Sequence, residues 1–561
     1  MKTLTRTIAS LSIFLTAAAC TPVLDNDEKP DNNQPEPPSV GQNEDAKRCV
    51  PVIIEEFREL YHPSAAVGIY MNDHTVFPKE GAKGTDPDRW HVIGITNHEL
   101  DGSTGEIHFS NGIGSSLAEG KFQDNPANGG IIMDALRKSP DPTPNPNREG
   151  ILCWAPHVVY HQGTYHMYYF SVLSSKWNME YATSTDLINW KDRTSELTLR
   201  VVGNHEGLLY ENGNIVETRD PMVIKYGNNW IMYTTAMWLD NGVRRGAVAV
   251  YESPDLKNWT FKGYALRNLE GAPIAAYSTC ESPFVTYKDG KFILSVTITV
   301  SDIATYHDTI IFVSDNPYNF GTYSGATQLE SSMHYAGRIS AHCPEFIHDK
   351  DNGKWYVTTA GWPDRLKYEG SFGGVGIAEM KWMTLDEAED YRKHACDSHK
   401  SAVLNHSFEK GNIDHWTRSG DFGVHMVNDA FKSRYGTYRD MIGMKTFCSY
   451  ANNYLGGDSQ TGSMRSNSFI IATGAKMSFY IAGGKDMDKL YVALVNADTE
   501  EIIFKETGLD TENSRRITWD LSAYAGTKAF VEVYDNSTAP WGHIGVDCIL
   551  VDGEPIEESN N

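Results

Sequence analysis

The chain has 561 residues, with 49 Lys and Arg against 73 Asp and Glu, which gives a formal net charge of −24. Its hydrophobic content of 40% is enough to bury a sizeable core, and this excludes a chain that is disordered throughout. Phosphate binding needs clustered Lys and Arg, so the acidic balance excludes nucleic acid as a partner.

Residues 1–19 are predicted to be a lipoprotein signal peptide. Lys2 and Arg6 precede a short apolar stretch, 8–19, which ends in three alanines before Cys20. This stretch is too short to span a hydrocarbon core of about 30 Å, so it predicts an export signal. Small residues directly before a cysteine resemble the bacterial lipoprotein signal, which implies a lipid on Cys20 and the membrane as a partner. Ordinary signal cleavage is the alternative.

Residues 20–48 are predicted to form an acidic, Pro-rich tether. The stretch 21–47 lacks aromatic residues and has acids and prolines in excess, a composition that cannot collapse into a core. Acidic residues after a lipidated cysteine resemble the export mark of several Gram-negative bacteria. The resemblance implies an exported lipoprotein at the outer membrane, on the cell surface.

The remaining cysteines suggest two disulfides. No CxxC pair is present, which argues against zinc-ribbon and redox sites. Cys49 and Cys396 flank the first large domain, and a bridge between them would close it end to end. Cys448 and Cys548 could pair within the last domain.

Residues 49–396 contain five copies of one unit. Each copy has a polar start, usually followed by Pro, then an alternating apolar strand, a turn and an aromatic-rich strand. The second strands begin at residues 90, 165, 230, 292 and 355. Further strands can be read in 182–190 and 250–259. Four short strands repeated five times predict a five-bladed β-propeller, and hence an all-β fold. An array of β-sandwiches is the alternative.

A second domain is predicted over residues 403–553. Its expected strands include 469–471, 477–482, 490–495 and 529–534, separated by Gly, Asn and Asp clusters. Short strands at such spacing predict a β-sandwich of the jelly-roll type. Helical periodicity is nearly absent from the whole chain, apart from a stretch near 386–393.

The residues that open the five repeats are candidates for one site. In a propeller the first strand of each blade lines the central funnel, so residues far apart in the chain converge there. The candidates are Asp73, Trp154, Arg219, Asp220, Glu281 and His342. Buried carboxylates repel each other, and their convergence indicates a chemical role. Glycoside hydrolysis needs two carboxyl groups beside the scissile bond, and a third can tune the acid.

Three motifs resemble the catalytic blocks of the five-bladed propeller glycoside hydrolases, families 43 and 32. They are Asn72-Asp73, Arg219-Asp220-Pro221 and Cys280-Glu281-Ser282-Pro283. The resemblance implies Asp73 as base or nucleophile, Asp220 as the carboxylate that tunes pKa and holds substrate, and Glu281 as general acid. Two positions depart from the families' pattern, where His74 replaces a Pro and Ser282 replaces a Gly or Cys.

The other candidates are assigned to binding. Trp154 is predicted to stack on sugar and Arg219 to donate hydrogen bonds to it. Packing within the blade is the alternative for Trp154. The family 43 resemblance implies that His342 reaches the axis and helps to hold a structural calcium, and a core imidazole is the alternative. We expect no cofactor to be required for the reaction.

Residues 403–553 resemble carbohydrate-binding module family 66, which accompanies levanases. The most distinctive stretch is 541–547, Trp-Gly-His-Ile-Gly-Val-Asp. The resemblance implies a domain that grips a sugar chain, and a purely structural sandwich is the alternative.

Together these observations predict a glycoside hydrolase that cleaves furanoside-containing polysaccharides, with fructans such as levan or inulin favoured. An arabinofuranosidase or xylosidase of the family 43 type is the first alternative. A sugar-capturing surface lipoprotein without activity is the second, although a binder has no reason to keep a general acid.

Overall fold

The structure is a computed structural model of the chain. It describes residues 49–556 except 56, 98–105, 133–151, 174–175, 212–213, 216–217, 270–279, 299–307, 324–333, 363–372, 395, 397–398, 421–427, 430–444 and 450–456. The predicted signal peptide, the lipidation site Cys20 and the tether therefore lie outside the described residues.

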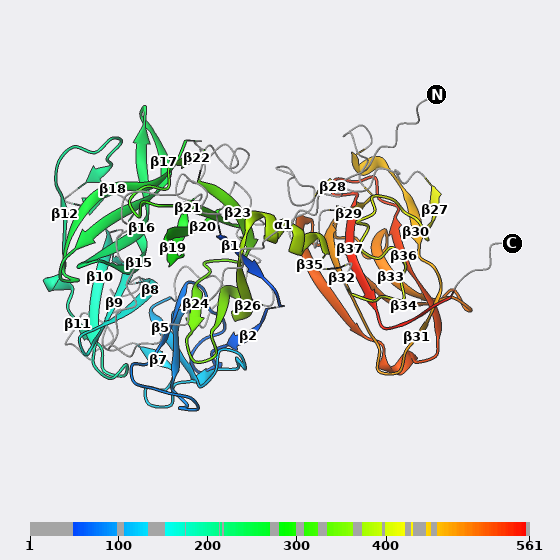
Figure 1. The fold of residues 1–561 in the computed structure, drawn as a ribbon, viewed down its shortest axis with the longest axis horizontal. Coiled ribbons are helices and arrows are strands. Elements are labelled where there is room, and N and C mark those ends of the chain that lie inside the picture. The colour runs from blue at the N-terminus through cyan, green and yellow to red at the C-terminus, as the bar shows by residue number, and fades with distance from the viewer. Residues whose placement is uncertain are drawn as a thin grey trace, which may run out of the picture. The chain divides into compact units, whose positions relative to one another are not determined.

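Residues 49–384 form five sheets of mainly antiparallel strands, and each sheet contains the first strand of one repeat (Figure 1). In three sheets this strand pairs with the next in the chain, and a third and fourth follow outward. The first sheet contains β3 (His74–Pro78), β4 (Trp90–Thr96), β5 (His108–Gly114), β6 (Gln123–Asp124) and β7 (Ile131–Ile132). The second contains β8 (Leu152–His161), β9 (Thr164–Leu173), β10 (Lys176–Ser184) and β11 (Lys191–Asp192). The fourth contains β19 (Glu281–Lys288), β20 (Lys291–Ile298), β21 (Asp308–Ser314) and β23 (Tyr335–Ser340).

The third sheet is enlarged by strands from its neighbours. It contains β15 (Arg219–Tyr226), β16 (Asn229–Asp240), β17 (Val243–Ser253) and β18 (Asn258–Asn268), and β12 (Thr198–Val201) and β22 (Thr322–Tyr323) both pair with β18 in parallel. A separate small ribbon joins β13 (Tyr210–Glu211) to β14 (Asn214–Ile215).

The fifth sheet combines the two ends of this region. It contains β24 (Phe346–Asp349), β25 (Lys354–Trp362) and β26 (Gly374–Thr384), and the first two strands, β1 (Cys49–Ile53) and β2 (Arg58–Tyr61), pair with β26. The start of the folded chain is thus tied to the fifth repeat, a pairing that stabilises the region by joining its ends.

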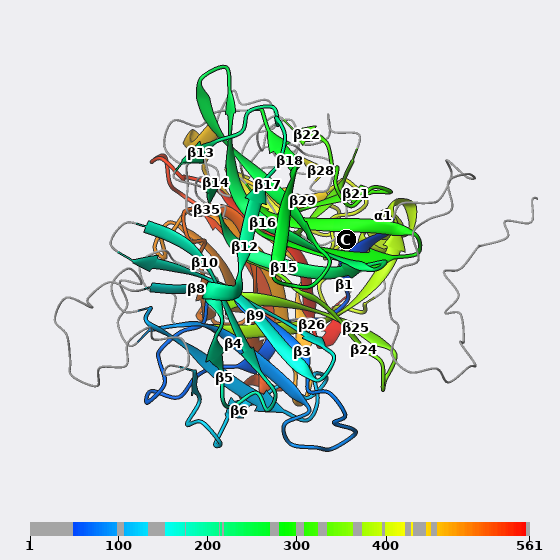
Figure 2. The same cartoon turned by 90° about the vertical axis from the view of Figure 1, so that its left-hand side faces the viewer.

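The first strands of the sheets contact one another. Strand β8 packs against both β3 and β15, and β15 packs against β19. The first and fifth sheets are joined by hydrogen bonds: His74 Nε2 lies 2.8 Å from Thr358 Oγ1, and the Val76 amide donates to Glu345 at 2.6 Å. Figure 1 shows β8, β15 and β19 near the middle of this region, and Figure 2 shows the same sheets turned by 90°. This arrangement brings the starts of the five repeats to one place.

One helix follows the last sheet. Helix α1 (Leu385–His394) overlaps the stretch in which the sequence showed helical character. Its start is a capping box: the Glu387 amide donates to Thr384 Oγ1 at 3.2 Å, and the Thr384 amide donates to a Glu387 carboxylate oxygen at 2.8 Å. These two bonds satisfy backbone donors that the helix itself leaves open.

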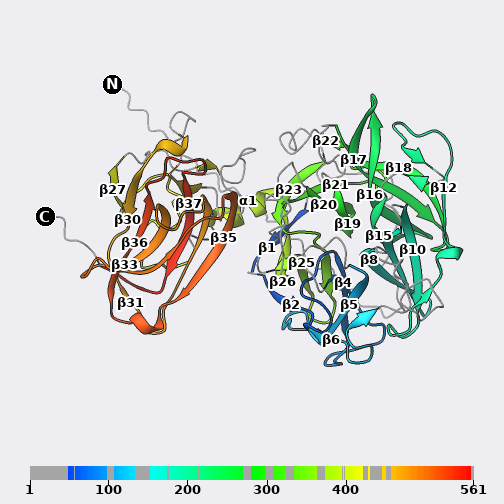
Figure 3. The same cartoon turned by 180° about the vertical axis from the view of Figure 1, so that it is seen from behind.

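The C-terminal region consists of two facing sheets (Figure 3). One contains β27 (Thr417–Gly420), β30 (Gly462–Arg465), β31 (Phe469–Ile471), β33 (Leu490–Asn496), β34 (Ile502–Glu506), β36 (Lys528–Asp535) and β38 (Gly553–Pro555). The other contains β28 (Asn428–Asp429), β29 (Lys445–Cys448), β32 (Lys476–Gly483), β35 (Thr511–Asp520) and β37 (Ile544–Val551). Buried side chains from both sheets, such as Val492 and Val546, form one core.

The all-β prediction is confirmed, and all four strands predicted for the C-terminal region are present. The disulfide expectations are wrong, because Cys396 pairs with Cys548 instead of Cys49 or Cys448. The sequence spacing could not show that residues 396 and 548, which are 152 positions apart, meet at β37. Among the described residues, no helix has both the length and the apolar character needed to cross a bilayer.

Candidate active site

A repeated backbone irregularity places the candidate residues. Ala155, Asp220, Ser282 and Cys343 have φ values of 44°, 52°, 49° and 39°, in the left-handed region that L-residues rarely adopt. Each is followed by a proline, and pairing with the next strand shifts register at this point in the second, third and fourth sheets. These are β-bulges, which tolerate Pro and change the direction of the side chains beside them.

The acids that open the repeats do not all lie at the same position of the bulge. Asp220 lies at the left-handed residue itself, whereas Glu281 lies one residue before the left-handed Ser282. Asp73, which precedes His74 as Asp220 precedes Pro221, matches Asp220 by sequence. The repeat therefore uses two successive positions, and the third and fourth bulges each supply two residues to the site, Arg219 with Asp220 and Glu281 with Ser282.

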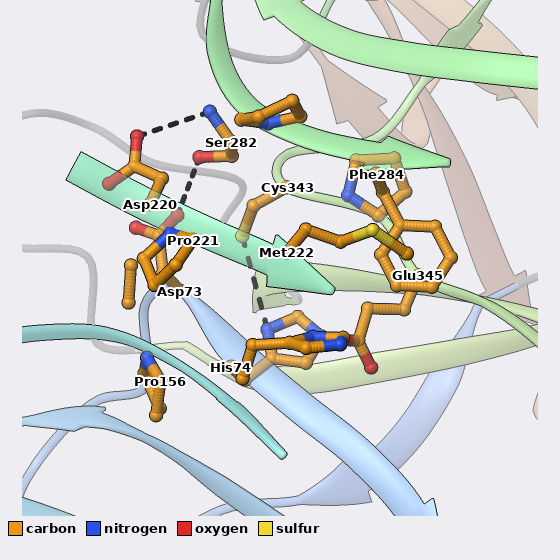
Figure 4. A pocket seen from close by; sticks show the side chains of 14 residues that line it. Asp73, His74, Pro156, Asp220, Pro221, Met222, Ser282, Phe284, Cys343 and Glu345 are labelled. Atoms are coloured by element: carbon orange, nitrogen blue, oxygen red, sulfur yellow. Dashed lines mark hydrogen bonds and ion pairs between the residues drawn. The ribbon is translucent and has the colours of Figure 1, made fainter. Parts of the chain in front are cut away.

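Asp73 faces the fourth sheet across the site. Ser282 Oγ donates a hydrogen bond to Asp73 Oδ1 at 2.5 Å, and the Ser282 amide donates to Asp220 Oδ2 at 3.2 Å (Figure 4). One serine thus joins two carboxylates that lie 147 positions apart in the sequence. These carboxylates border a pocket that is also lined by His157, Pro283 and Glu345.

Asp220 is buried and held by neutral donors. Thr235 Oγ1, on β16, donates to Asp220 Oδ2 at 2.6 Å, and the Ser282 amide donates to the same oxygen. Arg219 Nε lies 3.4 Å from this oxygen. These contacts fix the carboxylate in one orientation.

Glu281 forms an ion pair with Arg219. The guanidinium Nη2 contacts Glu281 Oε1, and the two residues are only 8% and 4% exposed. Because Arg219 also faces Asp220, one buried cation lies between two carboxylates and offsets their mutual repulsion.

The carboxyl group of Asp73 has a raised pKa. Burial first and then the negative charges of Asp220 and Glu281 raise this pKa, the Ser282 hydrogen bond and the charge of Arg219 lower it, and the net result is a pKa of about 7. A carboxyl group with a pKa near 7 can gain or lose a proton near neutral pH, as acid–base catalysis requires.

Of the two remaining binding candidates, His342 lies beside this group. Trp154 is partly buried; its Nε1 donates to Glu106 Oε2 at 2.5 Å, and its ring stacks on Phe170 with centroids 6.3 Å apart. His342 is fully buried, and its Nε2 lies 3.0 Å from Asn72 Oδ1, beside Asp73. The structure therefore places His342 next to the acids, and it shows Trp154 held by its own hydrogen bond and ring contact.

Three potential metal ligands meet at this point. One donor atom each from Asp73, His342 and Cys343 lies within 4.8 Å of the others. Calcium takes six to eight oxygen ligands, whereas this set offers one carboxylate, one imidazole and one thiol, a combination typical of zinc. The set does not fit the calcium expected at His342, and we derive no step through a metal.

Some residues of the site were not predicted. Thr235 carries no sequence signal, because its role depends on the pairing of β15 with β16. Ser282 was noticed only as a departure from the family pattern, although a hydroxyl group beside a general acid is a signal that could have been followed. Glu106 lies in no motif.

Comparisons with known proteins identify the class of this site. Residues 214–405 match the family model described as Glycosyl hydrolases family 43. This segment is therefore similar to family 43 glycoside hydrolases. It includes Arg219, Asp220, Glu281 and His342, whereas Asp73 and Trp154 precede it. The prediction that the chain is a glycoside hydrolase is confirmed at the level of enzyme class.

A curated relative and several solved structures are also similar. The glycosyl hydrolase ecdE of Aspergillus rugulosus is 36% identical over 99 residues, which are 18% of this chain and 14% of that protein, so the chain matches about a seventh of its length. The family 32 β-fructofuranosidase BmSUC1 of Bombyx mori has a TM-score of 0.39 at 14% identity, covering 89% of this chain and 95% of that one. An exo-β-1,3-galactanase of Phanerochaete chrysosporium has a TM-score of 0.45 at 10% identity, covering 88% and 99%.

Proposed function

We propose that the chain hydrolyses glycosidic bonds of furanoside-containing polysaccharides, with fructans such as levan or inulin as the favoured substrates. The observation that supports this is the meeting of three acids: Ser282 joins Asp73 to Asp220, and the buried Arg219 lies between Asp220 and Glu281. A pair of carboxyl groups with different environments is what glycoside hydrolysis needs.

The proposal includes a closed, five-bladed propeller for residues 49–396. The packing of β3, β8, β15 and β19 supports this, as do the hydrogen bonds between the first and fifth sheets and the pairing of β1 with β26. Closure matters for function because only a ring brings the first and fourth repeats, and so Asp73 and Ser282, to the same centre.

Each side chain has a role in the proposed reaction. Glu281 donates a proton to the leaving oxygen, Asp73 acts as base or nucleophile, and Asp220 orients the site and holds substrate. Arg219, which contacts Glu281, is placed to bind substrate hydroxyl groups, and such binding would draw the guanidinium away from the acid. Trp154 offers a ring for sugar stacking, and His342 supports Asn72 beside the base.

The match of residues 214–405 favours a second candidate, an arabinofuranosidase or xylosidase of the family 43 type. The two candidates share the carboxylates and differ in the sugar at the cleavage point. A panel of levan, inulin, arabinan and arabinoxylan separates them by the sugar released.

Glu281→Gln tests the proposed acid. We expect the loss of the transferable proton to lower kcat on the best substrate by at least about 100-fold. The matched control is Glu180→Gln, a buried glutamate of β10 that accepts a hydrogen bond from Ser171 at 2.7 Å, and its turnover should stay near that of the parent. Equal turnover in parent and Glu281→Gln would remove Glu281 as acid. No turnover by the parent on any glycan would favour the sugar-capturing lipoprotein.

We also propose that residues 403–553 bind the same glycan, as a module like family 66. In the stretch that carries this resemblance, Asp458 accepts hydrogen bonds from the Trp541 amide at 3.1 Å and pairs with His543 Nδ1 at 2.6 Å. Binding would raise the local concentration of substrate at the catalytic domain. Affinity electrophoresis of the Glu281→Gln chain in levan gels measures it, and unretarded migration would favour a structural sandwich.

Export and anchoring remain proposals as well. A lipid on Cys20, followed by the tether 20–48, would hold the enzyme at the outer membrane, where it would encounter polysaccharide substrates. Labelling of expressing cells with an alkyne fatty acid should mark the parent and leave Cys20→Ala unmarked.

A further inference from the structure

One sheet of the C-terminal sandwich carries tyrosine rings on its outer face. In this sheet β27, β30, β36, β33 and β34 follow one another, each paired with the next (Figure 3). Val492 of β33 and Val533 of β36 belong to the core between the two sheets. Because side chains alternate along a strand, the neighbouring residues Tyr491 and Tyr534 face outward.

Four outward residues form one row across four strands. Strand register pairs Tyr491 with Tyr534, Tyr534 with Ser463, and Ser463 with Ser419. The two rings stack with their centroids 4.9 Å apart and an interplanar angle of 23°. The two serine hydroxyl groups lie 2.7 Å apart and share a hydrogen bond. The row thus changes from aromatic rings to hydroxyl groups at the step from Tyr534 to Ser463.

The row leaves one ring face of Tyr534 for a ligand. Strand β34 pairs with β33 on the side away from β36, and Lys505 Nζ of β34 lies over the Tyr491 ring, 5.2 Å from its centroid. Tyr491 is therefore covered by Lys505 on one side and by Tyr534 on the other. Among the described residues, no second ring and no cation stacks on Tyr534. Its other side faces the short side chain of Ser463, and Tyr534 itself is partly exposed.

The charged groups beside the row are already paired. Arg465 donates to Glu532 and to Glu500, both at 2.9 Å. Lys505 Nζ lies 3.6 Å from an oxygen of Asp488. Two cations therefore face three acids, and the surface has no excess of positive charge. Such a surface repels a polyanion and suits an uncharged ligand.

We propose that this outer face binds an uncharged glycan, with one sugar ring stacked on Tyr534 and its hydroxyl groups bonded to Ser463 and Ser419. A sugar ring has an apolar C–H face and a rim of hydroxyl groups, which match an aromatic ring beside hydroxyl donors and acceptors. The inference rests on the proposed glycan binding by residues 403–553. It places the ligand on the sheet rather than at the 541–547 stretch.

Affinity electrophoresis of the full Glu281→Gln chain tests the site, with levan, inulin, arabinan or arabinoxylan in the gel. Adding Tyr534→Ala should raise the dissociation constant for the retarding glycan about tenfold. Tyr534→Phe keeps the ring and should stay within about threefold of Glu281→Gln alone. All variants keep the same catalytic domain, so differences between them report on the sandwich.

Tyr480→Ala is the matched control. Tyr480 is a partly buried tyrosine of β32 in the opposite sheet, with Arg516 Cζ 5.9 Å from its ring centroid. Its neighbours Phe479 and Ile481 belong to the core, so its ring also faces outward, on the other side of the sandwich. This variant should be retarded as strongly as the Glu281→Gln chain.

Ser463→Arg tests the site without removing a ring. Its guanidinium can cover the open face of Tyr534, as Lys505 covers Tyr491, and we expect binding to weaken about tenfold. Ser463→Ala removes one hydroxyl group and should weaken binding about threefold. Circular dichroism of each variant verifies that the sandwich is folded.

The outcomes separate this site from the proposed function. If Tyr534→Ala and Ser463→Arg bind as tightly as Tyr480→Ala, the site lies elsewhere, and loss of binding in Trp541→Ala would place it at the 541–547 stretch. Stronger retardation by polygalacturonate than by the uncharged glycans would overturn the assigned ligand class. If none of the four uncharged glycans retards the Glu281→Gln chain, the proposed glycan binding of residues 403–553 fails, and the site at Tyr534 fails with it.

Discussion

Ionisation of Asp73 lowers the free energy of unfolding of the fold. Burial and the neighbouring acids raise its pKa to about 7 from an ordinary value of 3.8. Between these two pH values the folded chain binds a proton that the unfolded chain has lost. The free energy of unfolding therefore falls as pH rises through this window, because the proton must leave a site that disfavours the charge. A functional carboxylate costs stability at the pH where it is ionised.

Asp73→Asn tests this balance. The amide is neutral at every pH, so the variant should match the parent near pH 3, and its advantage in the free energy of unfolding should grow between about pH 4 and pH 7, to about 1–2 kcal/mol after allowance for partial exposure. Thermal unfolding followed between pH 3 and pH 8 measures the difference. Asp192→Asn, at an exposed aspartate of β11, is the control and should show no such trend. A difference that stays constant across the pH range would contradict the assigned perturbation.

At the scale of elements, the outer hairpins of the second and third sheets share one turn. Asp186 accepts bonds from the amides of Ile188 and Asn189 at 2.9 and 2.7 Å, and Asp255 accepts bonds from the amides of Lys257 and Asn258 at 3.0 and 2.8 Å. The residue after each aspartate is a fully buried leucine with a φ above 60°. The aspartate thus stabilises a turn that inserts a leucine between sheets.

Replacing this aspartate should destabilise the hairpin. Asp186→Ala removes the acceptor for the two amides, and we expect a loss of about 1 kcal/mol. Burial acts to raise the pKa of Asp186, but the hydrogen bonds outweigh it and lower the pKa to about 2. The stabilisation is therefore present above pH 4 and lost as pH falls toward 2, so the parent and the variant should converge there. Urea unfolding at pH 6 and pH 2.5 measures this.

Two comparisons complete that test. Asp255→Ala should reproduce the loss in the neighbouring sheet, since its contacts are the same. Lys257→Ala, which changes an exposed side chain of the same turn, should cost less than about 0.5 kcal/mol. If Lys257→Ala lowers the free energy of unfolding as much as Asp255→Ala does, the aspartate is not what stabilises the turn.

The positions of the strands were the part of the structure that the sequence predicted best. Alternating apolar residues and turn clusters located the first two strands of every repeat, because one face of each strand must be buried. The bulges were not predicted, since a left-handed residue such as Asp220 is decided by tertiary contacts and leaves only a following proline as a signal. Thr235 and Glu106 were missed because their contacts come from strand register and not from any motif.

At the scale of the whole molecule, distant residues meet because the first strands of successive sheets pack against one another. The convergence of the acids could be foreseen from the repeat, because each acid lies at the start of a repeat, although not at one fixed position of it. The disulfide could not be foreseen in this way, because no repeat relates residue 396 to residue 548. Disulfides persist mainly in oxidising compartments, which agrees with the export proposed from the N-terminal sequence.

The disulfide between Cys396 and Cys548 should stabilise the C-terminal sandwich strongly. It closes a loop with a sequence separation of 152, which includes nearly all of that region, and such a long loop loses much entropy in the unfolded chain. Cys548→Ser should therefore cost about 2–5 kcal/mol, seen as a lower Tm of the sandwich transition in calorimetry. Cys396→Ser and the double variant should show the same loss, because a disulfide broken from either side is fully broken. Addition of a reductant should lower the Tm of the parent to that of Cys548→Ser and should leave the Tm of the variant unchanged. A parent whose Tm does not respond to reductant would contradict the pairing.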